Sequence, residues 1–289
     1  MAPSVRLASI LGLSCLAFLL AAPLAAAPIE AGARQQTVTL GEEKIPVFLY
    51  RPSCENPSLL LVFHGVARNA GGYRNYARPL ADQLCFVVLA PKFDRKEFPV
   101  WRYQQGGIKR KNGTTRSERD WTGQFVIELV DWARKQEGKA LPYSLLGHSA
   151  GAQFLSRVAA FTPKEARRIV IVNPSSYVLA ATDVAAPYGL GDVYGPEKSK
   201  EALKRYLATP VTIMLGQEDV GDKNLSETPE AKAQGATRYE RGLNTFKAAR
   251  EMAERQRLPF NWRLVEVPGV AHNAKKMFSS KQALNAIEP

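Results

Sequence analysis

A five-residue motif near the middle of the chain has the composition of a nucleophile site. Gly147-His148-Ser149-Ala150-Gly151 follows the apolar run 143–146 and precedes a helical pattern over 150–161. A serine on a sharp turn from strand to helix presents its hydroxyl above a sheet, and the tightness of that turn requires small residues on both sides. The motif therefore predicts that Ser149 is the nucleophile of an acyl-transfer reaction.

A serine hydroxyl needs a neighbouring base, and the chain has only three histidines. His272 follows the last apolar run, 262–267, in a loop near the C-terminus. The base comes last in the chain order serine, acid, histidine that accompanies such a turn, so we predict that His272 is the base. His148 is interpreted as structural, because its side chain should point away from the reacting position, and His64 as a residue that orders its loop.

The third member of such a triad is a carboxylate that holds the imidazole in the correct tautomer. It should follow the apolar run 211–215, and three candidates lie there: Glu218, Asp219 and Asp222. We predict Asp219, which is four residues beyond the run, with Asp222 as the alternative and Glu218 last.

Acyl transfer also needs two backbone N–H groups that bind the oxyanion. One comes from the residue after the nucleophile, here Ala150, and the other from the loop after an early strand. His64-Gly65-Val66 occupies that loop, and we predict Val66 as the second donor. This chemistry needs neither a metal nor a cofactor, and we expect none.

Elements of a parallel sheet must position these residues. Short apolar runs without alternating polarity alternate with helical patterns, which is typical of an α/β fold with a mostly parallel central sheet and helices on both faces. Sites in such sheets lie at the carboxyl ends of the strands. The expected strands are 37–40, 45–50, 58–63, 86–90, 143–146, 168–172, 211–215 and 262–267. Further helices are expected over 71–84, from an N-cap at Asp120 to Glu137, and over 237–257.

Two long connections carry aromatic residues. Trp101 and Tyr103 lie in the loop 91–119, and we predict that they form a substrate-binding wall. Residues 174–208 are interpreted as a small lid-like insertion with three tyrosines, Tyr177, Tyr188 and Tyr194. Arg238 and Arg241, at the start of the 237–257 helix, are interpreted as structural or solvated.

The motifs around His64, Ser149, Asp219 and His272 follow one another in this order along the chain. With them, roughly residues 58 to 275 resemble the α/β-hydrolase superfamily, and in particular bacterial exported esterases and polyhydroxybutyrate depolymerase-like hydrolases. The resemblance implies a serine hydrolase that cleaves a carboxylic ester or a similar acyl bond. No cysteine follows His64-Gly65, whereas many depolymerase relatives have one there. A serine peptidase on the same fold and a non-catalytic binding protein with a degenerate site remain alternatives.

The N-terminus has the pattern of an export signal. Arg6 precedes an apolar core, and an alanine-rich stretch follows. We predict a signal peptide over 1–27, with cleavage between 25 and 33, and a single α/β-hydrolase domain over 34–289. An uncleaved membrane anchor is the alternative.

Two cysteines, Cys54 and Cys85, lie beyond the predicted signal, each just ahead of an apolar run. An even pair in an exported protein favours a disulfide, and neighbouring parallel strands would bring the two residues to the same end of the sheet. Two independent buried thiols are the alternative. These features together indicate a periplasmic or extracellular protein.

The chain carries a formal net charge of +12. A basic surface favours anionic partners, but nucleic-acid binding needs a concentrated basic patch. We therefore expect a small-molecule or polymeric ester as the substrate, no nucleic acid, and no stable membrane insertion after the signal is removed.

Overall fold

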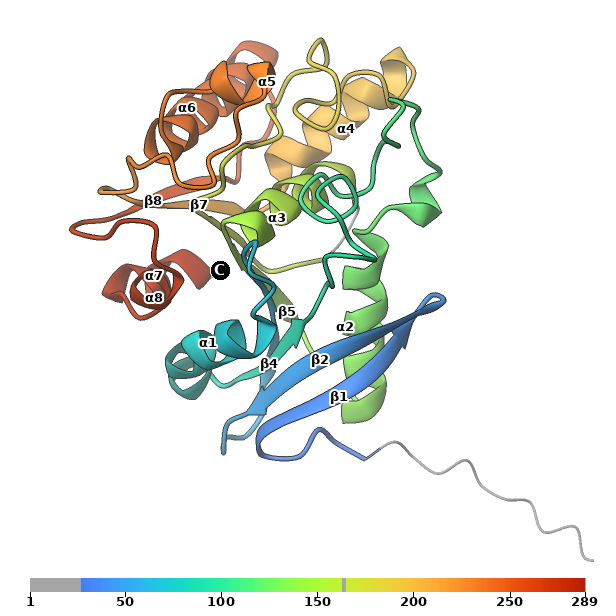
Figure 1. Cartoon of the computed structure of the whole chain (residues 1–289), viewed down its shortest axis with the longest axis vertical. Helices are drawn as coiled ribbons and strands as arrows, with labels where there is room; N and C mark the ends of the chain where they lie inside the picture. Colours follow the sequence, from blue (N-terminus) through green and yellow to red (C-terminus); the bar gives the residue numbers. More distant parts are fainter. Residues whose placement is uncertain (1–26, 163–164, 289) are drawn as a thin grey trace, which may run out of the picture.

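One eight-stranded sheet forms the centre of the computed structural model, which describes residues 27–162 and 165–288 (Figure 1). The strand order is β1-β2-β4-β3-β5-β6-β7-β8. β2 pairs antiparallel with β1 and β4, and all other neighbours are parallel. The strands are β1 (Gly32–Leu40), β2 (Glu43–Arg51), β3 (Ser58–Phe63), β4 (Phe86–Pro91), β5 (Tyr143–His148), β6 (Ile169–Val172), β7 (Val211–Gly216) and β8 (Arg263–Val267). The predicted mostly parallel α/β sheet is confirmed.

Helices cover both faces of the sheet. Two clusters of buried apolar side chains lie on opposite faces, since alternate residues of the inner strands join different clusters. Side chains of α2, α3, α4 and α6 belong to one cluster, and those of α1, α7 and α8 to the other. The helices are α1 (Ala70–Leu84), α2 (Gln124–Glu137), α3 (Ala150–Phe161), α4 (Pro196–Ala208), α5 (Pro229–Lys232), α6 (Arg238–Gln256), α7 (Ala274–Phe278) and α8 (Lys281–Ile287), with a short 3₁₀ turn at Glu118–Asp120.

The predicted N-cap at Asp120 is wrong. Asp120 ends the 3₁₀ turn, and α2 begins four residues later, after Gly123. Tertiary hydrogen bonds hold the intervening residues: the Trp121 indole N–H donates to the Arg116 carbonyl, and the Thr122 hydroxyl donates to the Arg102 carbonyl. Trp121 is held in an extended conformation, with φ of −69° and ψ of 141°, where local sequence alone favours a helix start.

The connection between β6 and β7 contains the predicted insertion. Its second half is α4, whose buried side chains join the cluster of α3. Its first half packs inward: Tyr177 and Tyr188 are buried, and the guanidinium of Arg157 donates to the Ser176 and Pro187 carbonyls. This segment contributes to the core of the domain.

A disulfide joins Cys54 and Cys85, as predicted, with 5.9 Å between their Cα atoms. The two residues lie at the amino ends of β3 and β4, where the Ser58 N–H also donates to the Cys85 carbonyl at 3.0 Å. The bond therefore closes the end of the sheet opposite the carboxyl ends of the parallel strands.

The predicted signal peptide lies almost wholly outside the described residues, which begin at Ala27. From there the chain runs into the first strand, and the Ile29 N–H donates to Oε1 of Glu137 at 2.9 Å. Across 27–162 and 165–288, none of the helices has the length and apolar character needed to cross a bilayer.

Candidate active site

Ser149 lies on the turn between β5 and α3, in a conformation that few residues adopt. Its φ of 57° and ψ of −116° fall outside the common allowed regions, at a cost on the order of 1–3 kcal/mol. The Ser149 N–H donates to the Val172 carbonyl at 3.0 Å, so the strained turn is attached to the adjacent strand β6. Strain of this kind is typical of a nucleophile elbow.

The two glycines of the motif are required by contact with backbone. A Cβ on Gly147 would lie 2.6 Å from the carbonyl oxygen of Gly151, and a Cβ on Gly151 would overlap the carbonyl group of Phe63. Backbone atoms of a strand or helix cannot rotate away as a side chain can. The spacing predicted from the sequence therefore reflects the close packing of β5, α3 and β3.

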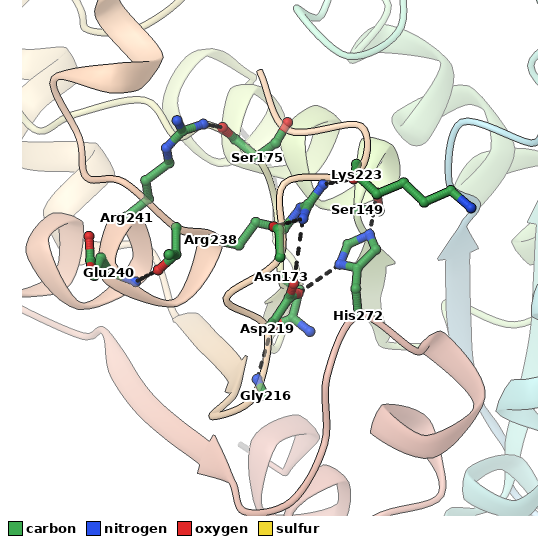
Figure 2. Close-up of polar contacts among 12 residues, drawn as sticks. Ser149, Asn173, Ser175, Gly216, Asp219, Lys223, Arg238, Glu240, Arg241 and His272 are labelled. Atoms are coloured by element: carbon green, nitrogen blue, oxygen red, sulfur yellow. Dashed lines mark hydrogen bonds and ion pairs between the residues drawn. The ribbon is translucent and has the colours of Figure 1, made fainter. Parts of the chain in front are cut away.

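His272 lies between Ser149 and Asp219 (Figure 2). Its Nε2 is 3.0 Å from the Ser149 Oγ, and its Nδ1 is 2.7 Å from Oδ2 of Asp219. An ionised carboxylate can only accept a hydrogen bond, so Nδ1 carries the proton and Nε2 is free to accept from the serine hydroxyl. This is the tautomer in which a histidine can take up a proton from serine.

The carboxylate that reaches His272 is Asp219. It is 1 % exposed, and its N–H donates to the Gly216 carbonyl in a tight turn at the end of β7. Asn173, at the end of β6, holds this turn by accepting the Gly216 N–H at 2.9 Å. Glu218 and Asp222 are exposed, and the carboxylate bound to the imidazole is that of Asp219 and of neither other candidate.

A buried guanidinium lies on the other side of Asp219. NH1 of Arg238 is 3.5 Å from Oδ1 of Asp219, and both side chains are 1 % exposed. Burial lowers the pKa of Arg238, and the Asp219 carboxylate raises it. The sequence indicated only that Arg238 is structural or solvated, because its partners come from a loop whose path the sequence does not define.

Backbone N–H groups suited to bind an oxyanion flank Ser149. Ala150 is the first residue of α3, so its N–H has no acceptor within the helix. Val66 lines the cleft next to Ser149, and no acceptor for its N–H occurs among the described residues. A Cβ on the preceding Gly65 would lie 2.7 Å from the Tyr73 hydroxyl, so glycine allows this loop to approach Ser149.

His64 orders that loop, as predicted. Its Nε2 accepts the Phe93 N–H at 3.1 Å, which leaves Nδ1 to donate to the Gly65 carbonyl at 3.0 Å. Complete burial lowers the pKa of His64 from 6.5 to about 3, so the ring is neutral and connects the loop to the segment after β4.

Tyr103 is part of this scaffold, and the prediction that it contacts substrate is wrong. It is fully buried, its hydroxyl donates to the His64 carbonyl at 2.9 Å, and its ring packs on Phe154. Trp101 is partly exposed and lies against the guanidinium of Arg116, outside the cleft around Ser149. The 91–119 loop folds back over the core because its aromatic rings bury more area there than they would on the surface.

His148 is buried beside His272. Its Nδ1 lies 3.1 Å from the Tyr73 hydroxyl, and its ring centroid is 4.5 Å from that of His272. Burial, together with the nearby His272, lowers the pKa of His148 well below its ordinary value. His148 is therefore a neutral ring that supports the imidazole of His272, in agreement with its structural interpretation. It lines the same cleft as Ser149, however, so the prediction that its side chain points away from the reacting position is wrong.

Ser149 and His272 open onto a cleft of about 420 Å³, whereas Asp219 is buried behind His272. Its lining is rich in amides and hydroxyls, includes Lys275, and contains no carboxylate. None of the tyrosines of the predicted lid lines it. The described residues also contain no group of histidine, cysteine or acidic side chains placed to hold a metal ion. The lining is Gly65, Val66, Ala67, Asn69, Tyr73, Tyr76, His148, Ser149, Asn224, His272, Asn273, Ala274 and Lys275.

No protein-family profile matches the chain, and no curated protein matches it either. Among solved structures, the chain is similar to a poly(3-hydroxybutyrate) depolymerase from Bordetella parapertussis, with 30% identity over 90% of this chain and 92% of the other and a TM-score of 0.82. It is also similar to poly(aspartic acid) hydrolase-1 from Sphingomonas sp. KT-1, with 32% identity over 89% and 99% and a TM-score of 0.82. An S-formylglutathione hydrolase from Agrobacterium tumefaciens shares the fold at 14% identity over 87% and 91%, with a TM-score of 0.53.

Proposed function

The chain belongs to the α/β-hydrolase superfamily and is a hydrolase of this fold, and from this premise we propose that it is a serine hydrolase that cleaves carboxylic esters through Ser149, His272 and Asp219. The observation that carries the proposal is the continuous hydrogen-bonded row from Ser149 Oγ through His272 to Asp219. This row supports nucleophilic catalysis over a non-catalytic binding role, since a binding protein has no need of an ordered tautomer.

In the acylation step, Ser149 Oγ attacks the carbonyl carbon of the ester while His272 Nε2 takes the hydroxyl proton. The negative charge that develops on the carbonyl oxygen is bound by the N–H groups of Val66 and Ala150. Asp219 stabilises the imidazolium, which then gives its proton to the leaving alcohol.

In the second step, water attacks the acyl-serine and gives its proton to His272. The acid product leaves, and the proton returns to Ser149. No metal or cofactor takes part in either step.

The cleft supports a polar substrate in preference to a long aliphatic acyl chain. Asn69, Asn224 and Asn273 provide hydrogen-bonding amides, and these groups would lose their water without compensation against a lipid chain. A short acyl group with its own polar atoms, as in the repeat unit of a hydroxyacid polyester, satisfies them.

Amide cleavage in an acidic polymer is the second candidate. Among the residues that the structure describes, Lys275 is the one lysine or arginine that lines the cleft. The relative with 32% identity is described as a poly(aspartic acid) hydrolase. A lysine without a carboxylate beside it in the cleft attracts anionic groups.

Active-site labelling tests the proposal. The purified protein should react with a fluorophosphonate probe and hydrolyse p-nitrophenyl acetate and butyrate, and Ser149→Ala should lose both reactions while Ser117→Ala, at an exposed serine, retains them. Undiminished labelling of Ser149→Ala would exclude Ser149 as the nucleophile. Parallel assays with an ester polymer and with poly(aspartic acid) decide between the two candidates.

Export is also part of the proposal. The Cys54–Cys85 bond and the depolymerase relative support an oxidising compartment outside the cytoplasm. We propose a single domain after a signal peptide that ends at Ala27, since Ile29 is buried and its N–H is bound by Glu137. Mass spectrometry of the exported protein would identify the first residue, and an N-terminus at or beyond Gly32 would contradict this site.

A further inference from the structure

We propose that Arg238 is a positioning residue of the hydrolytic site, which fixes the Asp219 carboxylate and its loop so that one oxygen faces His272. The inference rests on the proposed function, because it assigns Asp219 to the triad. It adds a fourth side chain that touches neither the substrate nor the reacting atoms.

The guanidinium of Arg238 binds the acid loop at three points (Figure 2). NH2 donates to the Lys223 carbonyl at 2.6 Å, and NH1 donates to the Gly221 carbonyl at 3.1 Å and lies 3.5 Å from Oδ1 of Asp219. A planar guanidinium has its donors in a fixed fork, so these contacts set the position of the loop 219–223 relative to the first turn of α6.

The contact with Asp219 selects which carboxylate oxygen is available. Oδ1 faces Arg238, so Oδ2 is left to accept the Nδ1–H of His272 at 2.7 Å. A carboxylate that is 1 % exposed has lost its hydration and requires compensating partners. Arg238 supplies positive charge on one side, and the imidazole supplies a hydrogen-bond donor on the other.

Arg238 also acts on the base through charge. Other groups around this pair are Tyr177 after β6, His148 at the end of β5, and Asp222 in the acid loop, with Lys275 at the cleft. Arg238 is the cation in contact with Asp219, so it offsets part of the charge with which Asp219 would stabilise a protonated His272.

Arg241 provides a matched control on the next turn of the same helix. It is also 1 % exposed, and its guanidinium likewise makes three contacts, here all with backbone carbonyls, those of Gly235, Ser175 and Ser226. These contacts hold neighbouring loops, but none reaches the Asp219 side chain. Loss of Arg241 therefore reproduces the removal of a buried guanidinium without releasing the triad acid.

The experiment compares Arg238→Gln, Arg238→Lys and Arg241→Gln with the wild type, using p-nitrophenyl butyrate as a neutral substrate. For Arg238→Gln we expect kcat to fall about 10-fold to 100-fold with KM little changed, since the acid and its loop lose their anchor. The midpoint of the acidic limb of kcat/KM against pH should rise, because a nearby cation no longer opposes protonation of the active site.

The two other variants separate charge from geometry. Arg238→Lys retains the charge but cannot form the fork, so kcat should fall while the acidic limb remains at the wild-type pH. Arg238→Lys also tests the proposal if Arg238→Gln does not fold. Arg241→Gln should unfold at a lower temperature but keep the wild-type kcat and pH profile. Equal losses from Arg238→Gln and Arg241→Gln, or an unchanged acidic limb in Arg238→Gln, would overturn the proposal.

A spectroscopic measurement keeps the inference testable if the wild type cleaves no ester. The proton between His272 Nδ1 and Asp219 should give a low-field ¹H NMR resonance, assigned by its absence in His272→Gln. It should be lost or shifted in Arg238→Gln and unchanged in Arg241→Gln. Failure of the proposed function would appear as missing turnover and probe labelling, whereas failure of the Arg238 assignment would appear as an unchanged resonance in Arg238→Gln.

Discussion

Replacing Gly147 with alanine should damage both stability and catalysis through a single backbone clash. The added Cβ would lie 2.6 Å from the Gly151 carbonyl oxygen, 2.7 Å from its carbonyl carbon and 3.0 Å from the Ala152 nitrogen. These atoms form the first turn of α3, next to the Ala150 N–H that is proposed to bind the oxyanion. The added methyl group can be accommodated only if the helix start moves away from β5.

The size of this movement sets the expected effect. Real Cβ atoms do not approach closer than 3.0 Å and usually stay beyond 3.4 Å, so the helix start must move by about 0.4–0.8 Å. Overpacking of this kind costs about 1–3 kcal/mol, partly offset by the smaller entropy of the unfolded chain with alanine. We expect a net loss of about 1–2 kcal/mol and a Tm lowered by about 2–4 °C. A displacement approaching 1 Å at the reacting groups should lower kcat/KM about 10-fold to 100-fold.

Thermal unfolding and p-nitrophenyl butyrate kinetics on the same preparation test both effects. Gly195→Ala is the matched control, because its added Cβ has no atom within 4 Å and its φ of −67° suits any residue. Its stability should change by less than about 0.5 kcal/mol. A Gly147→Ala variant with kcat/KM within twofold of the wild type would refute the reasoning, even if its Tm fell.

Three further predictions follow from separate parts of the molecule. Asp219→Asn should lower kcat by up to about 10⁴, because the amide favours the wrong tautomer of His272, while the exposed Asp222→Asn should cost less than about tenfold; steady-state kinetics with the reverse order would move the acid to Asp222. Replacing Cys54 and Cys85 with serine opens a cross-link between residues 31 apart and should lower the free energy of unfolding by about 3.7 kcal/mol in the chain-entropy model; an unchanged urea midpoint under non-reducing conditions would contradict this. The pKa of His64 is about 3 in the folded protein against 6.5 ordinarily, so the unfolded chain binds more protons and stability should fall with decreasing pH between about 6.5 and 3, by up to about 1.4 kcal/mol per pH unit. His64→Gln should reduce the pH slope of the unfolding free energy in that window, and a slope equal to that of the wild type would count against this assignment.

The elements around the candidate site were predictable because their constraints are local. β3 and α3 have the predicted bounds, Ser58–Phe63 and Ala150–Phe161. The continuous apolar run of β3 fits only a strand buried on both faces, and Gly147 and Gly151 mark the turn before α3. The same logic placed Asp219 and His272 at the ends of neighbouring parallel strands, where the structure brings them together.

Other features depend on tertiary contacts that leave little local signal. Tyr103 lies in a polar, glycine-containing loop, so nothing in the sequence indicates that its hydroxyl reaches the His64 carbonyl in the core. Helices α7 and α8 have five and seven residues, too short for a helical period to stand out. They are stabilised by packing against α1 and the sheet.

The position of Arg238 has a consequence for how the site can change during evolution. Asp219, the proposed acid, and Arg238, its proposed anchor, are 19 residues apart within one connection, between β7 and β8, whereas Ser149 and His272 come from two other connections. Recombination that exchanges the whole β7–β8 connection between related genes transfers Asp219 and Arg238 together. A crossover inside that connection separates them. A related protein whose acid follows another strand would not need an arginine at the start of α6. The residues at the positions of Asp219 and Arg238 should therefore change together.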